Sequence, residues 1–358
     1  MLPLQTIPVI GMDVGPFLVL ALAALAGGAF GAALGALPSF IFTGFVVFLG
    51  EGLAILQSQI ADLPGIPGGE LGVGVTGVIG FGAVTGPHIS FAAGVAASAY
   101  VGKKYPEMNP DGWDYHLGKN ITEAYGTKPD ILAVGAIFGL LGLLIAQIAG
   151  GLGLPTDGIA LSVFLTAMVA RVVFGYPLVG KPAGDGYLDM GPFAREEPRD
   201  QDDDVHEGNA GRLAVEPWLP HQYKWAGVAV IGVVGGVLGG YIWLKTGSIF
   251  LGYAISAMSL LFLNLGVAKI PVTHHITLLG AVGAVLAMPL FGSALAAVVA
   301  AGVLGGVTGV VGEFTQRVFY SHSGTHVDPP AMAITVMMFV IGALYLLGVL
   351  PNAGYLGL

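Results

Sequence analysis

The densest group of polar side chains in this sequence lies near its C-terminal end, directly before a long apolar run. Residues 321–330 are Ser-His-Ser-Gly-Thr-His-Val-Asp-Pro-Pro. Proline is tolerated in the first turn of a helix, where its missing N–H breaks no hydrogen bond, so we expect Asp328 to be the N-cap and Pro329 the first helical residue. Imidazole, carboxylate and hydroxyl groups would then gather at the positive end of a helix, an environment suited to anion binding.

Three further histidines stand at the start of apolar segments. Ser90 follows His88 by two residues, and Thr277 follows the pair His274 and His275. Histidine can carry a proton, donate a hydrogen bond to an anion or respond to pH. Polar groups inside a membrane are costly unless they are satisfied or used. Two interpretations stay open: these histidines cap helices at the membrane surface, or they face a central cavity.

A second aspartate, Asp157, also precedes an apolar run. Capping alone accounts for Asp157, whereas Asp328 has more polar neighbours than a cap requires. A His/Asp cluster can bind a metal ion, but thiolate ligands are absent because the chain has no cysteine. We therefore predict no metal and no cofactor, and a substrate-binding site formed by His88, Ser90, Asp157, His274, His275, Thr277, His326 and Asp328.

Composition places these residues in a membrane protein. Of the 358 residues, 55% are hydrophobic and 10% charged, against about 25% charged in soluble domains. Several runs approach the roughly 20 apolar residues that span a bilayer. The net charge of −9 and the lack of a basic tract argue against a nucleic-acid partner. We predict an all-α, polytopic transmembrane helical bundle in the cell membrane, with the lipid bilayer as its partner.

Hydropathy and helix breakers predict about ten spans in two groups of five. The first group falls within residues 1–177 and the second within 225–358, separated by a hydrophilic, acidic linker at 178–224 that contains an Asp/Glu/Arg run at 195–204. The predicted spans are 15–37, 39–58, 74–101, 131–152, 157–177, 225–244, 247–266, 274–290, 293–318 and 329–350.

The two groups resemble each other in sequence, which indicates an internal repeat. Both begin with glycines at every fourth residue, a spacing that lets membrane helices pack closely. An extra segment at about 51–70 is present only in the first group. The matched segments are 27–35 with 232–240, 42–45 with 250–253, 84–91 with 272–278, and 154–160 with 325–331.

Basic residues give the orientation, because Lys and Arg concentrate in cytoplasmic loops. They are frequent in 102–130 and 178–224, and only Lys245 falls on the opposite side. We expect both of these segments to be cytoplasmic and both termini to lie outside. An odd number of spans per group makes the copies inverted, a common transporter plan with a binding site at the midplane.

Two short motifs resemble those of the HPP family of integral membrane proteins. Residues 86–90, Gly-Pro-His-Ile-Ser, are similar to the Gly-His-x-x-Ser helix start of that family, with 274–277 as a looser counterpart. Residues 325–331 are similar to its His-Pro-Pro motif, except that Asp328 precedes the prolines and His326 lies two residues earlier. The resemblance implies membrane transport, with nitrite or a related small anion as substrate in some members. The departures leave the substrate open.

We therefore expect a transporter or channel for a small polar solute or anion, bound between two inverted repeats. The alternative is a non-transporting scaffold or accessory subunit in which glycines pack the helices and histidines cap them. No nucleophile elbow or phosphate loop is present, so we predict that the protein is not an enzyme. An intramembrane metal enzyme using the His/Asp cluster is a weaker alternative, and self-association into a homo-oligomer is left open.

Overall fold

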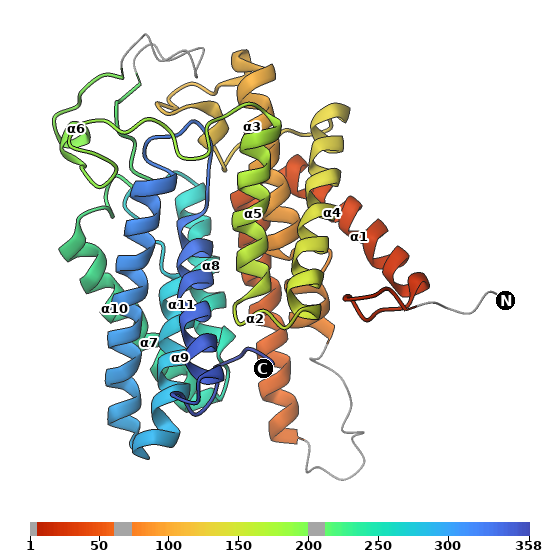
Figure 1. Ribbon diagram of the computed structural model, residues 1–358, viewed down its shortest axis with the longest axis vertical. Helices are drawn as coiled ribbons and strands as arrows, with labels where there is room; N and C mark the ends of the chain where they lie inside the picture. The colour runs from red at the N-terminus through yellow and green to blue at the C-terminus, as the bar shows by residue number, and fades with distance from the viewer. Residues whose placement is uncertain (1–5, 61–73, 200–211) are drawn as a thin grey trace.

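The chain folds into a bundle of helices, shown in Figure 1 as a computed structural model that describes residues 6–60, 74–199 and 212–358. No strand occurs in this part of the chain, in agreement with the predicted all-α class. Short π- or 3₁₀-helical turns lie at η1 (Val75–Gly80), η2 (Pro87–Phe91), η3 (Pro106–Met108) and η4 (Leu117–Lys119). The α-helices are α1 (Val14–Leu34), α2 (Ala36–Ile60), α3 (Ala92–Lys104), α4 (Pro129–Gly151), α5 (Gly158–Val173), α6 (Gly191–Ala194), α7 (Trp225–Thr246), α8 (Phe250–Asn264), α9 (His274–Phe291), α10 (Ala294–Phe319) and α11 (Pro329–Leu346).

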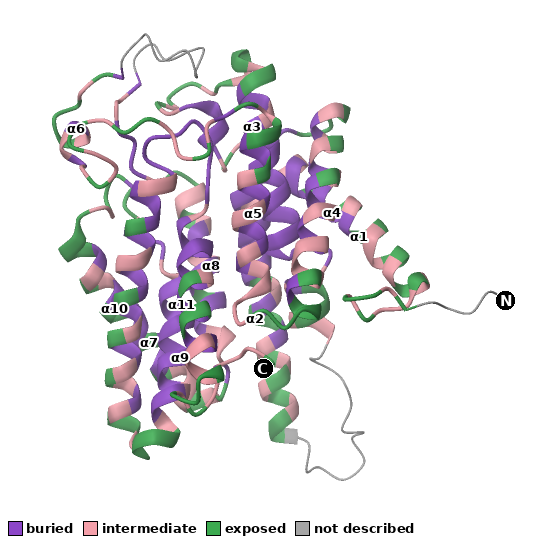
Figure 2. Ribbon diagram, viewed as in Figure 1, coloured by how far each residue is buried: buried purple, intermediate pink, exposed green. Residues whose placement is uncertain are grey.

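Seven of the described helices are long and apolar enough to cross a membrane, namely α1, α2, α4, α7, α9, α10 and α11. Two shorter apolar helices, α5 and α8, fall where spans were also predicted. Large hydrophobic side chains are exposed on the outer faces of the bundle, while buried residues lie between the helices (Figure 2). A bundle with an apolar exterior is suited to lipid, because only closed hydrogen-bonded structures such as helices are stable there.

The predicted span 74–101 is not one continuous helix. It consists of η1, a turn at 81–86, η2 and then α3. Gly80, Gly82 and Gly86 lie within seven residues of one another, and Pro87 follows without an N–H to donate. These residues account for the break. The extra segment predicted at 51–70 continues α2 as far as Ile60, and its remainder lies outside the described residues.

Most helices of each predicted half pack mainly on helices of the same half. Helix α1 packs on α4 and α3, and helix α7 packs on α10 and α9. The halves meet where α2 lies against α8 and α5 lies against α11. The core between them is formed by side chains from both halves, including Phe40, Phe91, Tyr253 and Leu279.

Glycines allow the closest of these helix contacts, as the four-residue spacing predicted. A Cβ on Gly232 of α7 would lie 2.8 Å from the carbonyl oxygen of Gly305 on α10. On the α1–α4 side, a Cβ on Gly28 would lie 2.8 Å from the Cα of Gly139. Real side chains do not fit at such distances, so glycine at these positions is required for the helix backbones to touch.

One end of the bundle is covered by two long connections that bind each other. The Tyr115 hydroxyl donates to the carbonyl oxygen of Pro217 at 3.0 Å. The Glu216 carboxylate accepts from Lys119 and from Arg212, each at 2.6 Å. Burial alone would raise the pKa of the Glu216 carboxyl, but the neighbouring Lys119 and Arg212 lower this pKa to about 2. The carboxylate therefore stays charged and joins the two connections.

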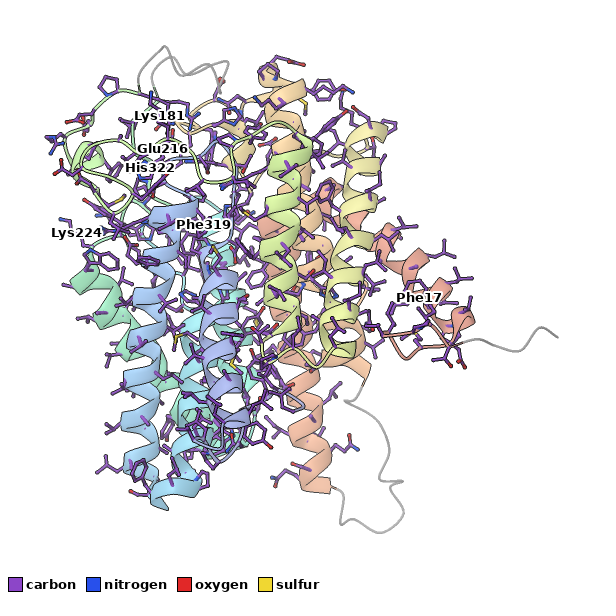
Figure 3. The ribbon with its side chains drawn as sticks, in the orientation of Figure 1. Phe17, Lys181, Glu216, Lys224, Phe319 and His322 are labelled. Carbon is purple, nitrogen blue, oxygen red and sulfur yellow. The ribbon has the colours of Figure 1, made fainter. Side chains whose placement is uncertain are left out.

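The described part of 178–224 is thus packed onto the bundle and is more than a solvated linker. Figure 3 shows Lys181, Glu216 and His322 at the same end of the molecule, far from Phe17 on α1. Glu216 donates its backbone N–H to the carbonyl oxygen of Ser321, which precedes α11. Residues 200–204 of the predicted acidic run lie outside the described residues.

Enlarging one glycine of the α7–α10 contact should destabilise the protein. In Gly236→Ala, the new Cβ would collide with the carbonyl group of Ala301 and lie 3.0 Å from the Cα of Gly305. Such overpacking costs about 1–3 kcal/mol, so we expect a lower melting temperature for the purified protein in detergent. Gly227→Ala in the same helix is the matched control, because no atom lies within 4 Å of its Cβ position. Equal melting of the two variants would contradict the packing argument.

Candidate substrate-binding cavity

A cavity of about 440 Å³ lies where the two halves meet. Its lining comes from α2, η2, α4 and α5 on one side and from α8, α9 and α11 on the other, with the C-terminal residues 355–357 closing part of it. Most of the lining is apolar. The side chains with polar atoms are His88, Gln147, Thr156, Asp157, Trp218, Tyr253, His274, Asp328 and Tyr355.

Two aspartates reach the cavity because each caps a helix that begins there. The Asp157 carboxylate accepts the N–H of Ala160 at 2.8 Å, and the Asp328 carboxylate accepts the N–H of Ala331 at 2.9 Å. Both N-caps were predicted from sequence, and both are confirmed. The other oxygen of Asp157 accepts the hydroxyl of Tyr355 at 2.7 Å. Each carboxylate is thus held in place by its own helix and remains partly exposed.

Two histidines line the same cavity from opposite halves. His88 lies in the short turn η2, and His274 is the first residue of α9. Their side chains are almost fully buried, and neither Nδ1 atom has a hydrogen-bond partner among the described residues. The same unpaired Nδ1 occurs in His275, His322 and His326, which lie outside the lining, so it is the place of His88 and His274 at the cavity that distinguishes them. Both therefore fit the interpretation that they face a central cavity instead of the membrane surface.

Aromatic rings form much of the wall around these polar groups. The His274 ring lies between Phe40, with centroids 4.7 Å apart, and Tyr253, with centroids 5.6 Å apart. The rings continue along the wall, because Phe81 packs on Tyr253 at 5.7 Å and Phe250 packs on Phe81 at 5.1 Å and on Tyr355 at 5.2 Å. These contacts fix the ring orientations and leave ring surface toward the cavity.

The charge of the lining is negative. Asp157 and Asp328 are its ionisable carboxyl groups, and no Lys or Arg is among the described lining residues. The helix ends that could attract an anion already bind these carboxylates. The site is thus chemically different from the anion site that the helix N-termini suggested.

Four of the predicted site residues lie outside the cavity lining. The Ser90 hydroxyl faces its own backbone at Gly86, and Thr277 donates to the carbonyl oxygen of His274 at 3.0 Å. The His275 ring lies against α10 near Gly312. Sequence similarity to the segment around His88 led to both His274 and His275 being predicted as site residues. Of these two, only His274 lines the cavity.

The fourth of these residues, His326, supports the cavity from behind. Its ring packs on Phe91 at 5.9 Å and on Tyr320 at 5.4 Å, and its Nε2 lies 3.3 Å from the Asp328 carboxylate. Contact with Asp328 makes His326 a neighbour of the lining, without a direct place in it.

The polar loop before α11 is held by a buried arginine, Arg171, which was not among the site residues predicted from sequence. The side chain of Arg171 donates from Nε to the Thr325 hydroxyl at 2.7 Å and from Nη1 to the Leu178 carbonyl oxygen at 2.5 Å. Nη2 donates to the Phe319 carbonyl oxygen and to the Ser323 hydroxyl, both at 2.5 Å. Much of the polarity upstream of Asp328 therefore immobilises the loop.

Sequence reasoning also missed the aromatic lining. Tyr253 lies in the matched segment 250–253, and an aromatic residue also ends the corresponding segment 42–45. An aromatic residue at the same position of both segments was therefore an available signal. Phe40, Trp218 and Tyr355 carried no comparable signal, since aromatic residues are common in membrane helices and at their ends.

Comparison with known proteins gives a family and no function. The model of a family described as "Family of unknown function (DUF7973)" matches residues 10–358. The chain belongs to this family. The match includes both predicted halves and every described cavity residue up to the C-terminus. No curated protein and no solved structure matches the chain. The resemblance to the HPP family remains an expectation.

Removing the Arg171 guanidinium should loosen the loop before α11. In Arg171→Gln, several buried oxygen acceptors lose their donor, so we expect a loss of at least about 3 kcal/mol of stability. Backbone hydrogen exchange in 319–327 should rise. Arg195→Gln is the control, because this exposed arginine pairs with Glu197 at the surface, where an ion pair contributes at most about 1 kcal/mol. Unchanged exchange in Arg171→Gln would show that other contacts hold the loop.

Proposed function

We propose that the protein is a membrane transporter or channel for a small polar or charged solute, which binds in the cavity between residues 1–177 and 225–358. The observation that carries this proposal is the space of about 440 Å³ between the two halves, lined by the carboxylates of Asp157 and Asp328 and by the buried His88 and His274. Pockets of this size with a few polar groups are typical of small-molecule sites. The proposal gives His88 and His274 no catalytic step.

The halves are proposed to be inverted repeats that enclose this site. Supporting this, α1 packs on α4 as α7 packs on α10, and the pairs α2–α8 and α5–α11 meet as expected across a two-fold axis. The N–H of Gly126 donates to Ala33 at the end of α1, and Arg317 donates to the carbonyl oxygen of Tyr223 just before α7. Both connections lie at one end of the bundle (Figure 1). The C-terminal end of α1 and the N-terminal end of α7 are therefore at the same end, so the two helices run in opposite directions. Inverted repeats with a site between them are common in transporters.

A non-transporting scaffold is the alternative, and the glycine contacts suit it equally well. The cavity favours transport. A scaffold would gain stability by filling the space, because each buried polar group left without a partner costs about 1–3 kcal/mol. Retention of two carboxylates and two histidines around an open volume is better explained by a ligand.

The membrane orientation gives a direct test of the proposed topology. The chain has no cysteine, so single cysteines can be labelled without background. We expect Glu107→Cys and Lys181→Cys to react with a membrane-impermeant maleimide from the cytoplasmic side. Ser58→Cys, near the end of α2, should react from the outside. All three positions are exposed, and labelling of all three from one side would contradict the topology.

Uptake into proteoliposomes tests transport itself. Choline, nitrite and glycerol serve as a cationic, an anionic and a neutral probe, and at least one should enter faster than into protein-free liposomes. His274→Ala and Asp157→Asn should slow that uptake, because both residues line the cavity. His221→Ala is the control, since this exposed histidine bonds to the carbonyl oxygen of Ile270 outside the cavity.

Two outcomes would count against the proposal. No uptake of any probe above the protein-free rate would favour the scaffold. Uptake that is unchanged in both cavity variants would remove the cavity as the route.

A further inference from the structure

The charge around the cavity carries an inference about the class of ligand. Both ionisable acids of the lining, Asp157 and Asp328, are held by the N–H groups of their own helices, and no described lysine or arginine reaches the cavity. An anion would therefore meet two carboxylates with no compensating cation. Like charges at close range in a low-dielectric site repel strongly. A ligand with a positive charge is the favourable occupant.

The aromatic rings of the lining suit such a charge. Phe40 packs edge to face on Phe91 and on Tyr253, and Tyr253 packs edge to face on His274. Phe250 and Tyr355 pack on each other and add two more rings to the wall. Ring faces attract a cation electrostatically, and cages of such rings recognise substituted ammonium groups. Carboxylates next to aromatic faces give a site in which both the charge and the apolar body of an organic cation are stabilised.

A metal ion fits these surroundings less well. Within the described residues, no group of three His, Asp or Glu side chains is placed to hold a metal ion. Hard metal ions need several oxygen ligands at about 2.0–2.6 Å. The volume of about 440 Å³ and its largely apolar wall suit an organic body instead.

The two histidines add imidazole rings to the polar part of the lining. The rings of His88 and His274 are at least nine-tenths buried, line the cavity, and have Nδ1 atoms without a partner among the described residues. They lie in the same lining as the two carboxylates and the aromatic rings.

We infer that the cavity binds a monovalent organic cation, an ammonium group attached to an apolar body, with Asp157 and Asp328 as its counter-charges and the surrounding aromatic rings as its walls. This inference rests on the proposed function in placing the substrate in the cavity, and it narrows the substrate class from a polar or charged solute to a cation.

Equilibrium binding to the purified full-length protein tests the inference independently of transport. Benzyltrimethylammonium, benzyl alcohol and benzoate share one ring and differ in charge. Binding can be followed by tryptophan fluorescence because Trp218 lines the cavity, and Trp218→Phe should abolish the signal. We expect the cation to bind roughly tenfold or more tightly than the alcohol, because charge and cation–π terms act only on the cation, and we expect benzoate to bind least.

Asparagine variants isolate the role of charge. Asparagine caps helices about as well as aspartate, so Asp157→Asn and Asp328→Asn keep the oxygen that accepts the backbone N–H while removing the negative charge. Each should weaken cation binding roughly tenfold and leave benzyl alcohol binding and the melting temperature nearly unchanged. Asp13→Asn is the control, because Asp13 directly precedes α1, accepts a hydrogen bond from the Thr6 hydroxyl at 2.9 Å and does not line the cavity.

The outcomes separate this inference from transport. Benzoate or benzyl alcohol binding as tightly as the cation, cation affinity unchanged in both asparagine variants, or no cation binding at millimolar concentration would each overturn it. Cation binding without uptake would remove the transport proposal and keep the inference. Nitrite or glycerol uptake without cation binding would do the reverse.

Discussion

The cavity depends on the need to satisfy backbone N–H groups at helices that begin inside a membrane protein. Such groups have no water to bond in hydrocarbon, so irregular backbone is stable only where protein or a cavity supplies partners. Asp157 and Asp328 supply them for α5 and α11. The same requirement explains why the turn η2 is buried among α1, α2 and α4. Capping therefore places two carboxylates beside the cavity, whatever the ligand.

Fixed carboxylates are useful only if the helices that carry them do not move apart. Arg171 links the end of α5 to the loop before α11 through hydrogen bonds to 319–325. Glu216 links that loop to the connection between α3 and α4 through Lys119. The C-terminal end of α5 and the loop before α11 are thereby joined to the polar connections at one end of the bundle.

Local rules were sufficient for part of this arrangement and insufficient for the rest. The N-cap role of Asp328 and the helical start at Pro329 follow from short-range sterics, and glycine spacing follows from helix periodicity, so both could be predicted. His274 and His275 could not be distinguished, because neighbouring residues on a helix point about 100° apart and only the packing of α9 decides which one faces inward. The role of Arg171 depends on partners near residue 320, a separation at which sequence spacing carries no information.

The ligand charge is where the sequence-based expectation and the structure diverge most. A helix N-terminus attracts an anion when its N–H groups remain free. In this protein the aspartate that marks the helix start is also the group that occupies those N–H bonds, so the residue used to find the site reverses its electrostatic preference. With no described lysine or arginine in the lining to restore a positive potential, the helix dipoles offset part of the aspartate charge and leave the cavity net negative. The helix dipoles alone would favour an anion, whereas the capping carboxylates favour a cation. The charge of the cavity therefore depends on both together.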